Sequence, residues 1–322
     1  MKVTNNSTLF IFLFIAAVVS SCGADSSVLG AREWKVVLRV LGDDGKPVSG
    51  ARAWVAYGSP REGQSSDPFA SNDWAKAGMT TEAGLFAARN ENVKSVSLGI
   101  HVRMEGFYPS DVVNDLGTSY DASTWNISPT LVLKRILKPI PMFAKRLRDG
   151  PPVADKAAGY DLEAGDWVAP YGKGIKSDFV FSAHHEKYSA DDWDYNLVVS
   201  FSNPGDGIQA FKVSEAEMPS ALRSPHEAPE QGYEPKWVKT RRQTPGQALD
   251  PILDSRMNFF FRVRTVLDDN GNIVSANYGK IYGDFMEFRY YYNPQANSRN
   301  IEFDPGKNLM KKLGPSEHVR EP

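Results

Sequence analysis

The densest run of side chains able to bind a metal or transfer a proton is His184-His185-Glu186. Neighbouring residues of a β-strand point to opposite faces, so one histidine and Glu186 would share a face and supply two ligands. A zinc site needs three or four ligands at defined spacing, and the chain has neither an H-E-x-x-H motif nor a cysteine cluster. We therefore interpret the run as a polar strand end and predict no metal site and no cofactor.

Two acidic runs contain calcium-type ligands, Asp191-Asp192-Trp193-Asp194 and Asp268-Asp269-Asn270-Gly271, but neither follows the order of an EF-hand loop. Aspartate and glycine form turns, which explains both runs. Tyr171-Gly172-Lys173-Gly174 lacks the spacing of a phosphate-binding loop, and no G-x-S-x-G or S-x-x-K motif is present. Catalytic carboxylate pairs come from distant strands and leave no motif. An envelope hydrolase with its site in the C-terminal domain therefore stays open as the alternative function.

Aromatic residues near turns, or on the polar side of strands, are the better binding candidates. Rings exposed on a β-sandwich can stack on sugars or anchor a protein partner. The alternative, which we favour, is a second core face buried at the domain interface. The candidates for ligand binding are Trp54, Trp167, Trp193, Trp237 and Tyr291.

The first residues have the layout of a secretory signal peptide, with a lysine at position 2 and an apolar run from Leu9 to Val19. That run spans about 16 Å, which is too short for a bilayer core of about 30 Å. Val19-Ser20-Ser21-Cys22 resembles the bacterial lipobox, and Cys22 is the chain's one cysteine. The resemblance implies cleavage before Cys22 and an N-terminal lipid that anchors the protein in the cell envelope. It favours the outer membrane where the host has one, because no aspartate follows Cys22. The alternative is a plain signal peptide with an incidental cysteine.

The formal charge of −2 gives no electrostatic case for nucleic acid, which needs a basic face, so we predict no nucleic-acid partner. Alternating apolar residues, as in 34–40 and 96–104, with turns between them and no amphipathic helix, predict an all-β fold. We expect two tandem β-sandwich-like domains. The predicted segments are a signal peptide (1–21), a lipid-anchored tether (22–32), a first sandwich (33–137) and a second β-rich domain (138–322) with a long excursion at 214–251. The predicted core of the first sandwich contains Trp34, Val36, Leu38, Val40, Phe86, Val96, Leu98, Ile100, Val102 and Leu133.

Three motifs of the first domain resemble the carboxypeptidase regulatory-like family. They are the Gly42–Ala51 segment, the Thr81–Phe86 segment and Gly106-Phe107. The resemblance covers about residues 34–136 and implies a transthyretin-like sandwich that is typically a non-catalytic appendage. The loop from Gly58 to Met79 departs from the compact pattern of that family and is a candidate for a binding function. We therefore expect a non-catalytic binding or assembly module with a carbohydrate or protein ligand, and a structural spacer is a further alternative.

Overall fold

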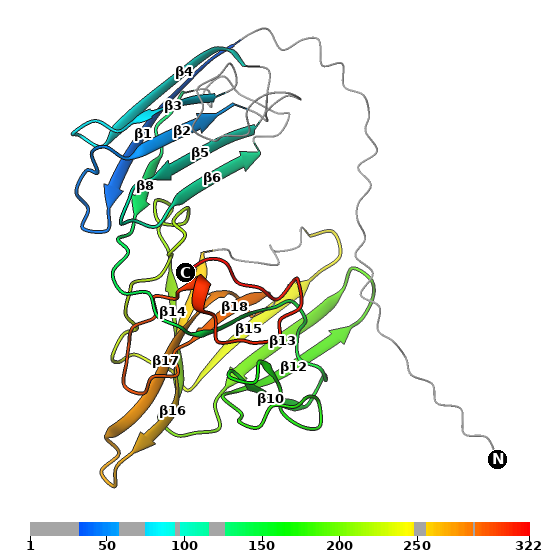
Figure 1. The fold of residues 1–322 in the computed structure, drawn as a ribbon. Helices are drawn as coiled ribbons and strands as arrows, with labels where there is room; N and C mark the ends of the chain where they lie inside the picture. The colour runs from blue at the N-terminus through cyan, green and yellow to red at the C-terminus, as the bar shows by residue number, and fades with distance from the viewer. Residues whose placement is uncertain (1–31, 58–74, 94–96, 116–125, 248–255, 286) are drawn as a thin grey trace, which may run out of the picture.

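The structure, a computed structural model, describes residues 32–57, 75–93, 97–115, 126–247, 256–285 and 287–322. In these residues the chain is all-β and forms two sandwich-like domains in tandem, as predicted (Figure 1). A short 3-10 helix, η2 (Pro305–Lys307), follows the last strand. No helix in the described residues is long and apolar enough to cross a membrane. The predicted signal peptide and Cys22 lie outside the described residues, and the predicted tether reaches Arg32, where the first strand begins.

The first domain packs two sheets face to face. One sheet has β1 between β4 and the parallel strands β7 and β8, and the other has the order β3-β2-β5-β6. The strands are β1 (Arg32–Gly42), β2 (Arg52–Ala56), β3 (Ala75–Met79), β4 (Leu85–Val93), β5 (Ser97–Arg103), β6 (Ser110–Asp115), β7 (Asn126–Ile127) and β8 (Thr130–Leu133).

The core of this domain follows the period of two along the strands. On β1, Val36, Leu38 and Val40 are fully buried while Lys35 and Arg39 face solvent. Apart from Val96, which lies outside the described residues, every predicted core residue is buried in one cluster. Alternation along the strand is therefore sufficient to identify the inner face of this sandwich.

The segment from Gly58 to Met79 is not a loop throughout, because its last residues form β3 (Ala75–Met79). β3 pairs along its whole length with β2 and forms the edge of the sheet. Its Ala-Lys-Ala-Gly-Met sequence lacks the β-branched and aromatic residues that mark strands, so the pairing with β2 determines its conformation. Residues 58–74 lie outside the described part of the chain.

The second domain also consists of two sheets, each with five strands, in the orders β11-β10-β12-β13-β15 and β14-β16-β17-β18-β9. Aromatic rings fill the space between them, among them Phe179, Phe181, Phe259, Phe261 and Phe285. The strands are β9 (Phe143–Leu147), β10 (Ala157–Asp161), β11 (Asp166–Trp167), β12 (Phe179–Lys187), β13 (Trp193–Ser200), β14 (Gly207–Lys212), β15 (Lys236–Gln243), β16 (Met257–Leu267), β17 (Ile273–Gly283) and β18 (Phe288–Tyr292).

The predicted excursion at 214–251 contains an integral strand of this domain. β15 pairs with β13 along all eight of its residues. Four of those residues are lysine or arginine, and they hide the apolar alternation that would mark a strand. The basic side chains are accommodated because β15 is an edge strand, where charge discourages pairing with other chains.

Residues 213–224, which include the first part of the excursion, cross to the first domain and are called the clamp segment below. Its backbone extends the first domain's hydrogen-bonding pattern: Val132 N donates to Ala216 O at 2.9 Å, and Asp111 N donates to Pro219 O at 2.8 Å. Ala221 N donates back to Pro109 O at 2.8 Å. The clamp segment therefore contacts both sheets of the first sandwich, at β6 and at β8.

Buried charged groups reinforce this domain junction. The Lys134 side chain is 5% exposed, and its ammonium group binds Glu217 at 3.0 Å and the carbonyl of Arg223 at 3.0 Å. Glu302, in the second domain, accepts a hydrogen bond from the Tyr108 hydroxyl at 2.8 Å and another from Leu137 N at 2.9 Å, both in the first domain. Because buried charges are tolerated only with well-placed partners, these contacts fix one arrangement of the two domains.

Candidate functional site

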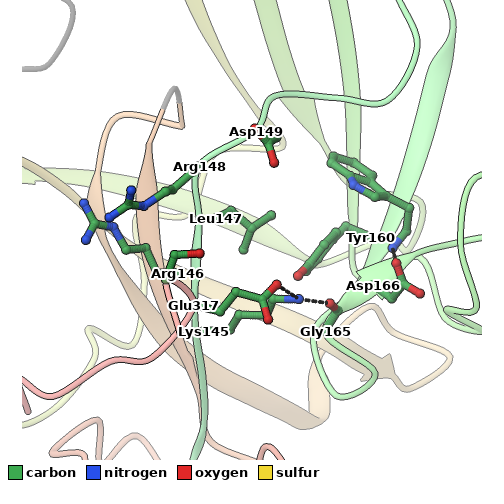
Figure 2. Close-up of a pocket in the computed structure, with 11 residues that line it drawn as sticks. Lys145, Arg146, Leu147, Arg148, Asp149, Tyr160, Gly165, Asp166 and Glu317 are labelled. Atoms are coloured by element: carbon green, nitrogen blue, oxygen red, sulfur yellow. Dashed lines mark hydrogen bonds and ion pairs between the residues drawn. The ribbon is translucent and has the colours of Figure 1, made fainter. Parts of the chain in front are cut away.

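A groove of about 320 Å³ lies in the second domain where the outer edges of its two sheets approach each other (Figure 2). One wall is the 145–149 segment, which contains the end of β9 and the residues after it. The opposite wall is the hairpin formed by β10 and β11. Ser316 and Glu317, from the chain after η2, complete the lining. The groove therefore combines three segments that are far apart in the sequence.

Aromatic and aliphatic side chains form the inner surface of the groove. Leu147 and Tyr160 are buried, and Trp167 is half-buried. The Trp167 ring meets Tyr160 edge to face at 5.1 Å and Phe181 at 5.3 Å, so the core holds it in place. Burial raises the pKa of the Tyr160 hydroxyl, which therefore stays protonated at neutral pH. Figure 2 shows this hydroxyl directed toward Leu147 and Glu317.

Carboxylates fix the backbone of the hairpin that carries Trp167. Asp161 accepts hydrogen bonds from the backbone N–H groups of Ala164 at 3.0 Å and Ile175 at 2.9 Å, and from two further N–H groups. Burial acts to raise the pKa of Asp161, but these N–H donors outweigh it and leave the pKa below its usual range. Asp166 accepts from Trp167 N at 2.8 Å and Lys173 N at 2.9 Å. Because the loop is already held in place, a ligand that binds the aromatic ring would cost the loop little conformational entropy.

The glycine-rich run at 171–174 belongs to the same loop and packs against the chain beneath it. A Cβ atom on Gly174 would lie 2.7 Å from the carbonyl oxygen of Asp166, so only glycine fits there. The run therefore serves close packing behind Trp167, which agrees with its interpretation as a loop between strands.

The rim of the groove mixes hydrogen-bond donors and acceptors. Lys145 donates to Gly165 O at 2.7 Å and pairs with Glu317 at 2.9 Å, as the dashed lines in Figure 2 show. Arg148 and Asp149 are exposed beside them. In all, the lining has three basic and three acidic side chains. Such a balance suits a ligand whose groups both donate and accept hydrogen bonds.

Of the five predicted binding aromatics, Trp54 and Tyr291 are buried, so their prediction as ligand-binding residues is wrong. Trp54 is 7% exposed and lies against His101, with 4.4 Å between the ring centroids. Tyr291 is fully buried and packs on Phe303 and Tyr282. Both face away from their domain's main core, and Tyr291 is covered by Phe303, from the chain after the last strand. Alternation along a strand cannot reveal that cover.

The other three aromatics are partly buried, and one of them lines the groove. Trp237 packs on Phe259 and Phe285 in the core of the second domain. Trp193 lies at the far end of β13, where the Arg241 guanidinium is 5.6 Å from its ring centroid. Trp167 is therefore the predicted aromatic that the structure places in the groove.

The two adjacent histidines point to different surroundings, as expected for neighbours on a strand. His184 Nδ1 lies 2.5 Å from Asp155 Oδ1, and this hydrogen bond raises the pKa of His184. Both side chains are more than half exposed, so they lie on open surface and not at the floor of a cleft. His185 packs on Trp193 and Tyr195.

Among the residues that the structure describes, the arrangement most similar to a catalytic nucleophile and its base lies at the domain junction. Ser224 Oγ lies 3.1 Å from the Lys280 ammonium nitrogen and 3.2 Å from the Tyr282 hydroxyl. Burial lowers the pKa of Lys280 well below its usual range. Ser224 and Lys280 are each fully buried, so no substrate reaches them in this conformation. Their contacts stabilise the junction.

The acidic runs form turns and ion pairs. Asp268 accepts from Asn270 N at 2.9 Å and Asn272 N at 2.8 Å, and Arg242 pairs with Asp192 at 2.7 Å and with Asp194 at 2.6 Å. Within the described ranges, no three histidine, cysteine, aspartate or glutamate side chains are grouped as a metal site requires.

Sequence reasoning missed most of the groove, including Lys145, Arg148, Asp149 and Glu317. The basic run Lys145-Arg146-Leu147-Arg148 was the one local signal for it. Glu317 joins these residues only because Arg146 N donates to Glu317 O at 2.9 Å, which attaches the C-terminal segment to β9.

No family model matches the sequence, and no curated protein is similar to it. Solved structures show weak likenesses. Catechol 1,2-dioxygenase from Acinetobacter has a TM-score of 0.25 at 12% identity; the match covers 35% of this chain and spans 56% of the dioxygenase. A shaft pilin from Lactobacillus rhamnosus has a TM-score of 0.22 at 14% identity, covering 54% of this chain and 90% of the pilin. A candidate carbohydrate-binding protein from Bacteroides uniformis has a TM-score of 0.18 at 13% identity, and the match covers 83% of this chain and 99% of that protein. Likenesses at these scores assign no function.

Proposed function

We propose that this chain is a non-catalytic binding module of the cell envelope and that its groove binds carbohydrate. The observation that carries the proposal is the half-buried Trp167 ring, held by the core beside a balanced set of charged and polar groups. Sugar rings have apolar faces that pack on aromatic rings, and their hydroxyls both donate and accept hydrogen bonds. The groove offers both kinds of contact within one small volume.

The size of the groove favours a sugar over a protein ligand. Specific protein interfaces bury about 1,200–2,000 Å² of surface, whereas small-molecule sites have volumes of about 300–1,000 Å³. A groove of about 320 Å³ fits one or two sugar rings of a longer chain. The loop that carries Trp167 is already held by Asp161 and Asp166, so binding requires little rearrangement.

We propose that the first domain is a carboxypeptidase regulatory-like sandwich that supports the second domain. A lipid on Cys22 would anchor the chain to the membrane. The lipobox-like Val19–Cys22 motif supports this anchor, and the outer membrane is the favoured location. In this arrangement the first sandwich separates the groove from the membrane surface, while the clamp segment fixes the direction in which the second domain extends.

Replacement of Cys22 by serine should release the protein from the membrane fraction or leave it uncleaved. The physical reason is that a single acyl-bearing thiol supplies the anchor, and serine cannot form the thioether. Detergent partitioning and gel mobility of the expressed full chain measure the change. Equal partitioning and equal mobility of the variant and the parent would rule out lipidation at this residue.

Trp167→Ala should weaken binding to a polysaccharide by about tenfold or more, because the ring supplies the apolar contact at the centre of the site. A glycan panel first identifies a binding polysaccharide, and titration calorimetry then compares the variants. Trp193→Ala is the matched control, since it removes a half-buried tryptophan outside the groove.

Asp149→Ala tests the same groove without disturbing the core, because Asp149 is exposed at the rim. We expect it to weaken binding several-fold while thermal unfolding stays unchanged. Equal affinities for the parent, Trp167→Ala and Asp149→Ala, with all three folded, would contradict a binding site in this groove.

A further inference from the structure

Three arginines lie together where β9 meets β18, at one end of the groove. Arg146 and Arg289 are directly opposite each other in the antiparallel register of the two strands. Arg148 lies two residues beyond Arg146 along the chain, and both line the groove. Figure 2 shows the guanidinium groups of Arg146 and Arg148 lying next to each other. The three side chains are called the arginine cluster below.

Two carboxylates face these three cations, and they neutralise the cluster incompletely. Glu287 forms a close ion pair with Arg146, and Arg148 Nε lies 4.0 Å from the same carboxylate oxygen. Arg289 reaches Glu321 at 3.7 Å. One of the three guanidinium groups therefore has a close carboxylate partner, and the other two have longer ion pairs, at 4.0 and 3.7 Å.

The inner member of the cluster also has an unused donor. The Nε atom of Arg146 is buried and has no hydrogen-bond partner among the described residues. Burial lowers the pKa of Arg146, and the positive charges of Arg148 and Arg289 add to that effect. Like charges directly opposite each other on paired strands destabilise a sheet, so packing gives no reason for this arrangement.

We propose that the arginine cluster binds the carboxylate of a uronic acid residue, so that the carbohydrate bound by the groove is an acidic polysaccharide. This inference rests on the proposed function. A planar carboxylate can accept paired N–H bonds from a guanidinium group, and Arg148, with a side chain 53% exposed, is free to supply them. One sugar ring would pack on Trp167 and an adjacent acidic residue of the same chain would lie against the cluster.

The experiment compares acidic polysaccharides with their neutral counterparts. The probes are polygalacturonate, alginate and hyaluronate, each also in a form whose carboxyl groups have been reduced to alcohols. We expect at least one acidic form to bind about tenfold more tightly than its reduced form, since a charge-assisted contact distinguishes them. Added salt should reduce this preference, because the arginines are partly exposed.

Arg148→Gln and Arg289→Gln should each remove most of the preference for the acidic form. Arg289→Gln, whose side chain lies outside the groove lining, should also leave binding of the reduced form intact. Lys212→Gln is the matched control, because Lys212 is an exposed cation on β14, at the opposite edge of the same sheet. Neither arginine variant should unfold more readily than the parent, since each relieves repulsion within the cluster. Loss of both the preference and the fold in both variants would mean that the cluster is structural.

The possible outcomes separate the two proposals. Equal affinity for acidic and reduced forms would overturn the arginine cluster as a binding site and leave the groove standing. Failure of every probe to bind, with another polysaccharide of the glycan panel still bound, would overturn the arginine cluster and leave the groove standing. Failure of the whole panel would overturn both. Binding to vesicles of phosphatidylglycerol that depends on Arg148, with no preference among the polysaccharides, would assign the cluster to a lipid surface and also overturn the inference.

Discussion

Asp178→Ala should lower the free energy of unfolding of the second domain by about 3–5 kcal/mol, the range for removing one partner of a buried ion pair. The Asp178 side chain is 2% exposed and accepts two hydrogen bonds from Arg264, at 2.8 and 2.9 Å. It also accepts one from Leu162 N at 2.9 Å, in the loop beside the groove. The variant therefore removes the most buried of the carboxylates around Arg264, which keeps Glu163 at 2.6 Å, and it releases part of that loop.

Asp194→Ala is the control for this prediction. Asp194 also pairs with an arginine, Arg242, at 2.6 Å, but both side chains are about two-fifths exposed. Exposed pairs contribute at most about 1 kcal/mol, so this variant should unfold almost as the parent does. Urea titration followed by tryptophan fluorescence measures both changes. Equal losses in the two variants would contradict the buried pair as a principal stabilising contact.

Leu98→Ala should destabilise the first domain by about 2–5 kcal/mol, the range for deleting a large apolar side chain from a packed core. Leu98 is fully buried on β5, within the cluster that also contains Trp34, Val36 and Ile100. Calorimetric unfolding of the full chain gives the comparison, because the clamp segment makes the second domain part of the first domain's environment.

Arg103→Ala is the matched substitution on the outer face of the same strand. Arg103 is 39% exposed and forms paired hydrogen bonds with Asp111, at 2.6 and 2.8 Å. Its loss should cost less than about 1 kcal/mol. Comparable losses for Leu98→Ala and Arg103→Ala would show that the inner and outer faces of β5 have been assigned incorrectly.

The contrast between these positions shows how far the sequence predicts the fold. Val36, Leu38 and Leu98 could be assigned to a core because alternation is a local property of a strand. Residues 236–243 could not be assigned to a strand, since their charges suit an edge that only the assembled sheet defines. Burial of Tyr291 was equally hidden, because its cover comes from chain beyond the last strand, including Phe303.

The groove was predictable in one residue only. Trp167 was a candidate because it lies beside glycine and aspartate residues, where a ring can be exposed. Its neighbours Lys145 and Glu317 are 172 positions apart by their numbers in the sequence and have no common pattern. The arginine cluster depends on the register of β9 with β18, which sets Arg146 opposite Arg289. Contacts of this kind are determined by tertiary structure, so a single sequence contains no local signal for them.

The clamp segment also determines how the molecule would carry mechanical load. A force on the N-terminal end of β1, directed along the strand, acts on the hydrogen bonds to β4 and β8. These bonds lie across the direction of the force and must break together. β8 is bonded in turn to Ala216 of the clamp segment, which continues directly from β14 of the second domain. Tension between the N-terminal end of β1 and the second domain therefore passes through several hydrogen bonds in parallel. The single covalent connection at 134–142 does not have to carry this tension alone.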